Sequence, residues 1–413
     1  MNIAISVAVL ACIFSILPCL WIEWKDKSPF LMIWVLNFLF VYFPLITYWL
    51  DGGFPKYLLF EAFVFIAVCQ LSYFVFLVLL KLAFCDGKLS SNFRLNLKST
   101  RKKDILIILV ALSIPFILLC NGISVAALLE STLADKRSLS LWYLTILIAS
   151  SFLFPHVIYT VSNKKWFLFF LTLSVFILVL LYFRSRSILV FMFLPIGFYL
   201  LFSNRRGLIW SFLIGCGVYV IAQVVKIIRY QGTLENGLNP SNWSSTAEQV
   251  ISENVSRGDL SIVSVFLNVI DDCATASYCG NWSFATKLFS TMGIVGGGDK
   301  TIEYTLYDHY IGSGMGGSLH PTCFGFAYAD GGGFWGIFFF LFLAMLRVSI
   351  QKSLLSTPRN LAYLGFVMYF VVFFSRGSVY NSFILVLFAF LCEILIQLSE
   401  KVPLILSVKK FQP

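Results

Sequence analysis

The sequence has little charge for its length. Asp, Glu, Lys and Arg make up only 12% of its 413 residues, whereas 59% of the residues are hydrophobic. Soluble domains carry about 25% charged residues, and a folded chain of this size still exposes a large surface. The composition therefore excludes an ordinary soluble globular protein and predicts that lipid covers much of the surface.

Histidine is scarce, and the cysteines show no metal-binding pattern. The three histidines are His156, His309 and His320. None of them recurs with Cys at the spacing of zinc ligands, so we expect no metal site and no cofactor. Most of the ten cysteines lie in apolar runs, where they pack as small hydrophobic residues. Cys273 and Cys279 lie in a polar segment instead, and they could form a disulfide if that side of the membrane is oxidising.

Other familiar signals are missing as well. The run Gly293–Thr301 lacks the Gly-Lys-Ser/Thr ending of a phosphate-binding loop, because Asp299 intervenes. The first apolar run has no basic residues before it, so we expect a membrane helix rather than a cleavable signal. The net charge of +10 gathers in short connections, which indicates membrane orientation rather than binding to nucleic acid.

What the sequence has in quantity is long apolar runs. A helix needs about 20 apolar residues to cross a bilayer, and its backbone groups must pair within the helix. Eleven runs meet this requirement. The predicted spans are residues 3–22, 30–50, 57–80, 105–121, 141–161, 166–183, 187–203, 207–225, 333–350, 360–375 and 378–399.

Positive charges alternate along the connections between these runs. The strongly basic connections contain Lys25, Lys27, Lys88, Arg94, Lys98, Arg101, Lys102, Lys103, Lys164, Lys165, Arg205, Arg206, Arg347, Lys352, Arg359, Lys401, Lys409 and Lys410. The positive-inside rule places them in the cytoplasm, which puts the N-terminus outside and the C-terminus inside. We therefore predict an all-α polytopic membrane protein with an N-terminal bundle of eight helices (1–225), a large external loop (226–332), and three C-terminal helices with a cytoplasmic tail (333–413).

Some basic residues break this pattern on the external side. Arg184 and Arg186 stand between two predicted spans, Lys226 and Arg229 lie one helical turn apart at the end of another, and Arg376 precedes a glycine. Arginine binds phosphate oxygens through two parallel hydrogen bonds, so a diphosphate is a natural ligand. The alternative is that these side chains reach lipid headgroups. Taken together, they predict one anionic site.

His320 stands near the end of the large loop, in a segment that leads into the next predicted span. It precedes Pro321 and the glycine-rich run Asp330–Gly333. A histidine at the membrane–water boundary could accept a proton from a sugar hydroxyl, or it could be a structural residue beside a proline turn.

The acidic residues of the loop give a weaker signal. They include Asp259, Asp271, Asp272, Glu303 and Asp308. We expect most of these carboxylates to lie on the solvated surface, with Asp271 and Asp272 as the first candidates for a metal site.

Four segments and the overall layout resemble one bacterial family. The segments are Leu181–Leu189, Lys226–Tyr230, His320–Gly325 and Phe374–Ser378. They resemble the arginine-bearing start of a span, the basic entry into the large periplasmic loop, the segment that closes this loop, and the late periplasmic arginine turn of the Wzy-type O-antigen polymerases. The spacing between Arg186 and Gly197 also resembles a pattern of some members.

The resemblance implies a membrane-embedded glycosyltransferase of the C type in the bacterial inner membrane. Such an enzyme joins oligosaccharide repeat units carried on undecaprenyl diphosphate at the periplasmic face, in lipopolysaccharide biosynthesis. It implies no cofactor and no metal. Its partners would be the lipid-linked glycans, the lipid bilayer and a regulator of polysaccharide chain length.

The resemblance also assigns roles to residues. The expected catalytic residues are His320, Arg229 and Arg376. The expected substrate-binding residues are Arg184, Arg186, Lys226, Tyr230 and Arg257. Two alternatives stay open: an O-antigen ligase, which shares this layout, and a flippase or other transporter of lipid-linked oligosaccharides. A transporter predicts polar residues buried within spans and repeated halves, and the sequence indicates neither.

Overall fold

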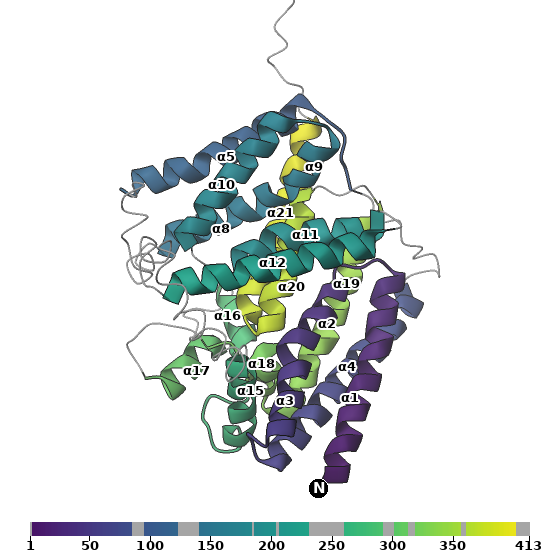
Figure 1. Ribbon diagram of the computed structural model, residues 1–413. Helices are drawn as coiled ribbons and strands as arrows, with labels where there is room; N and C mark the ends of the chain where they lie inside the picture. The colour runs from purple at the N-terminus through teal and green to yellow at the C-terminus, as the bar shows by residue number, and fades with distance from the viewer. Residues whose placement is uncertain are drawn as a thin grey trace, which may run out of the picture.

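The computed structural model describes residues 2–84, 95–122, 140–183, 186–203, 206–230, 260–291, 301–312, 319–356 and 361–401. Every regular element within these ranges is a helix (Figure 1). This agrees with the predicted all-α class, because a chain in lipid must satisfy its backbone hydrogen bonds locally.

The N-terminal half of the chain contains two groups of helices. The first group is α1 (Asn2–Lys25), α2 (Leu31–Asn37), the π-helix η1 (Phe38–Tyr42), α3 (Phe43–Asp51) and α4 (Lys56–Phe84). The second group is α5 (Arg101–Cys120), α8 (Ser140–Leu153), η2 (Phe154–His156), α9 (Val157–Ser162), α10 (Trp166–Phe183), α11 (Arg186–Ser203) and α12 (Gly207–Tyr230). Figure 1 shows α11 and α12 crossing the direction of α1 and α4 steeply.

The remainder of the chain begins with short helices and ends with long ones. The short helices are α15 (Leu260–Asp272), α16 (Ser283–Thr291), α17 (Ile302–Tyr310), α18 (Thr322–Gly331) and η4 (Gly333–Gly336). The long helices are α19 (Ile337–Ser356), α20 (Leu361–Arg376) and α21 (Val379–Lys401). The described parts of the predicted external loop thus contain several short helices, and α15 forms on the apolar stretch that the sequence shows there.

Seven helices within the described ranges are long and apolar enough to cross a membrane, by length and composition. They are Ile3–Lys25, Leu31–Asp51, Lys56–Phe84, Arg101–Cys120, Thr145–Ser162, Trp166–Phe183 and Gly333–Ile350. Shorter apolar helices occupy the other four predicted spans: Ile188–Ser203, Gly207–Ala222, Leu361–Arg376 and Ser382–Leu391. The polytopic helical class is confirmed, and the total of eleven spans stays a prediction.

Helix α20 is the central helix of the molecule. Its residues from Leu361 to Val372 are all buried, and it packs against α2, α8, α11, α18 and α21. A Cβ atom on Gly365 would lie 2.3 Å from the carbonyl oxygen of Ser151, so a glycine there lets α20 and α8 approach closely. By contrast, outward side chains such as Phe167 and Phe212 are exposed, as expected for a surface that faces lipid.

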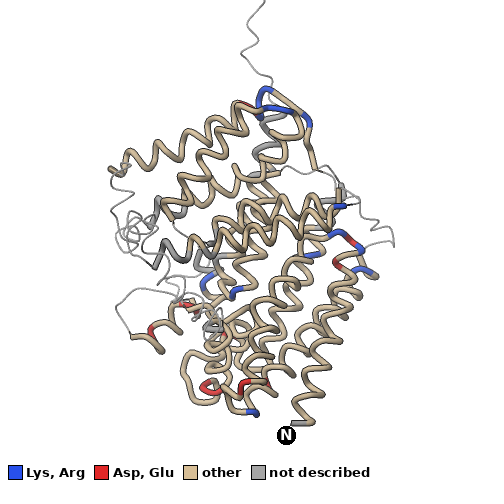
Figure 2. The backbone as a smooth tube through the Cα atoms, viewed as in Figure 1, with Lys and Arg blue, Asp and Glu red and all other residues tan. Residues whose placement is uncertain are grey.

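The short helices α15, α17 and α18 lie at the end of the molecule where the N-terminus also lies (Figure 1). Helix α18 is buried along its whole length and packs on α15, α19 and α20. Figure 2 shows most described acidic residues at this end and most described Lys and Arg residues away from it. The N-terminus and the described loop helices thus lie at one end of the molecule, and their side of the membrane stays a prediction.

A buried ionic cluster joins α1, α4 and α19. The Arg347 Nε atom lies 3.2 Å from each carboxylate oxygen of Glu23, and Nη2 donates to Asp26. Lys81 donates to Asp26 at 2.7 Å, and the Tyr73 hydroxyl donates to Glu23 at 2.5 Å. Arg347 was expected in a connection between spans, but it lies within α19 and its side chain is 0% exposed.

Polar side chains are also buried in the middle of spans. Gln70 in α4 is 0% exposed, and its carbonyl oxygen accepts a hydrogen bond of 2.5 Å from Ser15 in α1. The expectation that the spans hold no buried polar residues was therefore wrong. These partners come from different helices, so no single apolar run in the sequence reveals them.

Candidate functional site

Helices α11 and α20 pack side by side in opposite directions. Phe191 in α11 stacks on Tyr369 and contacts Phe373 in α20, whereas Phe198 packs on Leu364 and Met368. Residues near the start of α11 therefore face residues near the end of α20, so the two helices are antiparallel. The first residue of α11 and the last residue of α20 therefore lie at the same end of this helix pair.

These two terminal residues are Arg186 and Arg376, both predicted members of the site. The hairpin of α11 and α12 adds a third helix end. The Ser211 hydroxyl in α12 donates to the carbonyl oxygen of Gly197 in α11 at 2.7 Å, so α12 runs antiparallel to α11 and its last turns extend past the start of α11. Lys226 and Arg229 belong to this last part of α12. Three basic helix ends are thus directed toward the same end of this helix group.

The turn after α20 contacts the turn before α18. Gly377 has a φ of 91°, and a Cβ atom there would lie 2.4 Å from the carbonyl oxygen of Thr322. Only glycine fits this position, both for its backbone conformation and for its close contact. The Arg376 turn and the His320 turn are therefore adjacent, as expected for a shared site.

His320 is affected electrostatically by this neighbour. Burial lowers the pKa of the His320 imidazole, and the Arg376 guanidinium lowers it further, to about 3. The half-buried ring is therefore neutral at pH 7, and its Nδ1 atom is shielded from solvent. A neutral imidazole can accept a proton, but a positive neighbour makes it a weak base until an anion binds beside it.

The residue that begins α18 has an unusual backbone. Thr322 has a φ of 68°, which is uncommon for a β-branched residue. Its side chain is fully buried, and its Oγ1 atom accepts a hydrogen bond of 3.1 Å from the Gly325 amide. The contact with Gly377 helps to hold this conformation, which costs about 1–3 kcal/mol in general.

Glu303 is a buried acid in this region. Most acidic residues of the large loop were expected on the solvated surface, but Glu303 is 1% exposed at the start of α17. Burial raises the pKa of its carboxyl to about 7, and the nearby Asp330 carboxylate raises it as well. The hydroxyls of Thr301 and Ser378 offset this in part. A polar segment gives no sign of this burial, because the covering residues come from α18 and the turn after α20.

Asp330, which is also buried, serves to position α16. Its carboxylate accepts hydrogen bonds from the Ser283 amide at 2.7 Å, the Ser283 hydroxyl at 2.5 Å and the Phe284 amide at 3.1 Å. These amides belong to the first turn of α16, where a carboxylate compensates free N–H groups and the helix dipole. Asp330 thus joins the end of α18 to the start of α16.

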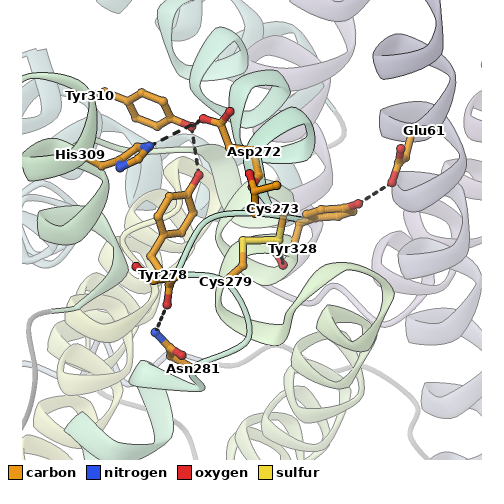
Figure 3. Close-up of a disulfide and its surroundings, with 11 residues drawn as sticks. Glu61, Asp272, Cys273, Tyr278, Cys279, Asn281, His309, Tyr310 and Tyr328 are labelled. Carbon is orange, nitrogen blue, oxygen red and sulfur yellow. Dashed lines mark hydrogen bonds and ion pairs between the residues drawn. A yellow bond between two sulfur atoms is a disulfide. The ribbon is translucent and has the colours of Figure 1, made fainter.

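The structure contains the disulfide that the sequence left open. Cys273 and Cys279 are bonded just after α15 (Figure 3). Beside them the Tyr310 hydroxyl donates to Asp272 at 2.7 Å and lies 3.0 Å from the Tyr278 hydroxyl. A disulfide favours an oxidising compartment for this segment.

The predicted metal candidates are engaged with tyrosines. Asp271 accepts a hydrogen bond of 2.6 Å from Tyr57, and Asp272 accepts from Tyr310. His309 lies 3.9 Å from Asp272. Among the residues that the structure describes, no group of three or more His, Cys, Asp or Glu side chains could hold a metal ion.

Some predicted site residues can be placed only in part. The backbones of Arg186, Lys226, Arg229 and Tyr230 are described, but their side chains are not. Arg184 and Arg257 lie outside the described residues. No family model, curated protein or solved structure matches the chain, so its function must be argued from the site itself.

Proposed function

We propose that this protein is an O-antigen polymerase of the inner membrane of a bacterium. It joins oligosaccharide repeat units carried on undecaprenyl diphosphate at the periplasmic face. The N-terminus and the large loop are periplasmic, and the C-terminus is cytoplasmic. The Cys273–Cys279 disulfide supports this orientation, because structural disulfides persist in oxidising compartments.

One observation carries the proposal. The basic start of α11 and the basic end of α20 lie at the same end of one helix pair, and the turn after α20 contacts the His320 turn. Helix α12, with its basic last turn, runs back toward this end, and α17 and α18 pack beside the His320 turn. A diphosphate needs several positive donors at fixed positions, and arginine is well suited to bind it. A neutral imidazole beside these donors suits a reaction in which a hydroxyl loses a proton.

In the proposed reaction, a hydroxyl oxygen of the acceptor repeat unit attacks the anomeric carbon of the donor glycan. The bond from this carbon to the diphosphate breaks, and undecaprenyl diphosphate leaves with the bonding electrons. Arg376, Arg186 and Arg229 stabilise the charge that develops on the leaving group. Arg184 and Lys226 add positive charge, and the hydroxyl proton passes to His320.

Substrate binding also prepares His320 for this role. In the free protein the Arg376 guanidinium lowers the pKa of His320. A bound diphosphate would offset this positive charge, so the pKa of the imidazole would rise toward the range in which it accepts protons well. Tyr230 and Arg257 are assigned to glycan contacts, and a chain-length regulator is the expected protein partner.

Deletion of the gene tests the reaction class. A strain that lacks a polymerase would keep lipopolysaccharide capped with a single repeat unit, visible as one short band on a gel. A strain that lacks an O-antigen ligase would carry no repeat unit on its lipopolysaccharide. Only the first result supports the proposed reaction.

Charge-neutral substitutions test the site. Arg376→Gln and Arg229→Gln should abolish long chains when the variants are expressed in the deletion strain, while membrane insertion stays intact. Lys56→Gln is the matched control, because Lys56 is exposed at the start of α4 and lies outside the proposed site. Normal polymer from both arginine variants would remove these residues from the mechanism.

A transporter of lipid-linked oligosaccharides is the second candidate, and the buried polar side chains favour it. Glu23, Arg347 and Gln70 are each 0% exposed within apolar helices, and ionisable groups inside spans often mark transport paths. Loss of a flippase would leave repeat units on the cytoplasmic side and none on lipopolysaccharide. The deletion strain therefore separates this function from polymerisation.

A further inference from the structure

Three segments of the chain meet at Glu303. The Leu319 amide donates a hydrogen bond of 3.0 Å to the Glu303 carbonyl oxygen, which ties α17 to the His320 turn. The Ser378 side chain is a hydrogen-bonding neighbour of the Glu303 carboxyl and lowers its pKa. Ser378 follows Arg376 and Gly377, so Glu303 contacts both turns that carry the proposed site.

The surroundings of the Glu303 carboxyl suit a neutral group better than an anion. It is 1% exposed, and its described polar neighbours are the hydroxyls of Thr301 and Ser378 rather than a cation. The charged group that faces it from α18 is Asp330, which repels a negative charge. On α17 itself, Asp308 is half-buried and His309 is exposed, while His320 and Arg376 belong to the adjoining turns.

We infer that Glu303 is a positioning residue whose buried carboxyl holds the His320 turn and the Arg376 turn in register beneath α17. This role rests on the proposed function for its effect on polymerisation, but the packing itself can be tested separately. Glu303 is not assigned to the acceptance of the substrate proton.

Ionisation would weaken this arrangement. The pKa of Glu303 rises from an ordinary 4.5 to about 7 in the folded protein, so the packed state prefers the protonated form. Packing is therefore strongest at low pH, and it weakens as the pH rises through about 7. A shift of this size corresponds to a change on the order of 300-fold in the local packing equilibrium.

Hydrogen–deuterium exchange of the full-length protein in lipid nanodiscs tests the packing. After correction for intrinsic exchange rates, peptides from residues 301–312 and 319–332 should lose protection between pH 6 and pH 8.5. Glu303→Gln, which cannot ionise, should stay protected at both pH values. Asp308→Asn is the matched control, because it removes a carboxylate from the same helix and should behave like the wild type.

Polymerisation supplies the second readout. The substrate is the lipid-linked repeat unit extracted from the deletion strain, and product length is followed on gels from pH 6 to pH 8.5. Wild-type product should shorten above pH 7, the Glu303→Gln product should not, and Glu303→Ala should give shorter product throughout.

The two readouts fail in different ways. If the wild-type protein makes no polymer at any pH, the proposed function fails while the exchange data still test Glu303. The positioning role is overturned if wild-type protection does not change with pH. It is likewise overturned if the protection of Glu303→Gln changes with pH as much as that of the wild type. It is also overturned if Glu303→Gln abolishes polymerisation and leaves protection intact, because that result indicates a proton acceptor.

Discussion

Glu23 and Glu303 are both buried, yet their surroundings differ in kind. Glu23 is 0% exposed and accepts hydrogen bonds from Arg347 and Tyr73 inside the membrane bundle. Glu303 is 1% exposed among hydroxyl groups and close to a second carboxylate. Burying a charge costs free energy unless an opposite charge and hydrogen bonds compensate it.

The difference separates two uses of a buried acid. The Glu23 cluster balances Glu23 and Asp26 against Arg347 and Lys81, so it joins three helices with no net charge. The Glu303 region has no such balance among its described contacts and lies beside the proposed site. Strained backbone at Thr322 and a shifted pKa at His320 occur in the same region. Strained backbone conformations and shifted pKa values are both typical of functional sites.

The largest effect is expected from breaking the paired cluster. Arg347→Met removes the cation and leaves Glu23 and part of the Asp26 charge buried without compensation. Removing one partner of a buried ion pair costs about 3–5 kcal/mol. The melting temperature of the purified protein and its level in membranes should both fall.

The paired variant Arg347→Met with Glu23→Gln is the control for this prediction. It removes both charges, so its loss of stability should be smaller than that of Arg347→Met alone. An equal or larger loss in the double variant would show that packing volume, rather than uncompensated charge, explains the effect.

The second effect concerns the pH dependence of stability. The raised pKa of Glu303 means that the folded state binds a proton more tightly than the unfolded state. Its contribution to stability is full below about pH 4.5 and is lost as the pH rises through about 7. A shift from 4.5 to about 7 corresponds to about 3 kcal/mol, so Glu303→Gln should stabilise the protein mainly above pH 7.

Melting curves of wild type and Glu303→Gln between pH 5 and pH 8.5 measure this difference. The two curves should diverge as the pH rises. Parallel curves would mean that Glu303 does not ionise within the folded protein over this range.

Gly377 gives the third prediction, which concerns the contact between the two turns. Gly377→Ala adds a Cβ atom where the Thr322 carbonyl oxygen is only 2.4 Å away, at a φ of 91°. The strain of a side chain in this conformation, with the displaced turn, costs about 2 kcal/mol. Polymer length should fall more than stability suggests, because Arg376 moves relative to His320. Gly52→Ala is the control, since its φ of 68° is similar but no atom crowds its Cβ position.

The sequence predicted the helical membrane class well, because apolar runs depend on local composition alone. It also predicted His320 and Arg376 as members of one site; their turns are adjacent, and the shared site stays a prediction. Charge alternation suggested their side of the membrane, which is a property of short segments. Apolar runs and charge alternation can be recognised within short segments, without knowing which distant residues they contact.

Burial of single polar residues could not be predicted in the same way. Arg347 stands near the end of an apolar run, so it was taken for a connection residue, and its partners in α1 are distant in sequence. Glu303 lies in a polar segment, and its cover comes from α18 and the turn after α20. The π-helical turn Phe38–Tyr42 within one predicted span also has no signal in the apolar pattern.

Asp330 provides the smallest effect and the sharpest contrast with Glu303, because it is a buried acid compensated by N–H groups rather than by a cation. Asp330→Ala leaves the amides of Ser283 and Phe284 without their acceptor at the start of α16. Loss of such a cap costs about 1 kcal/mol. Hydrogen exchange should speed up in residues 283–291 and change little in α15. Asp330→Asn keeps an acceptor oxygen and should retain most of the protection.

Asp330→Asn also removes the charge that faces Glu303, so the pKa of Glu303 should fall and the loss of α17 protection should begin at a lower pH. If that pH does not change, Asp330 does not contribute to the shifted pKa of Glu303, and burial alone accounts for it.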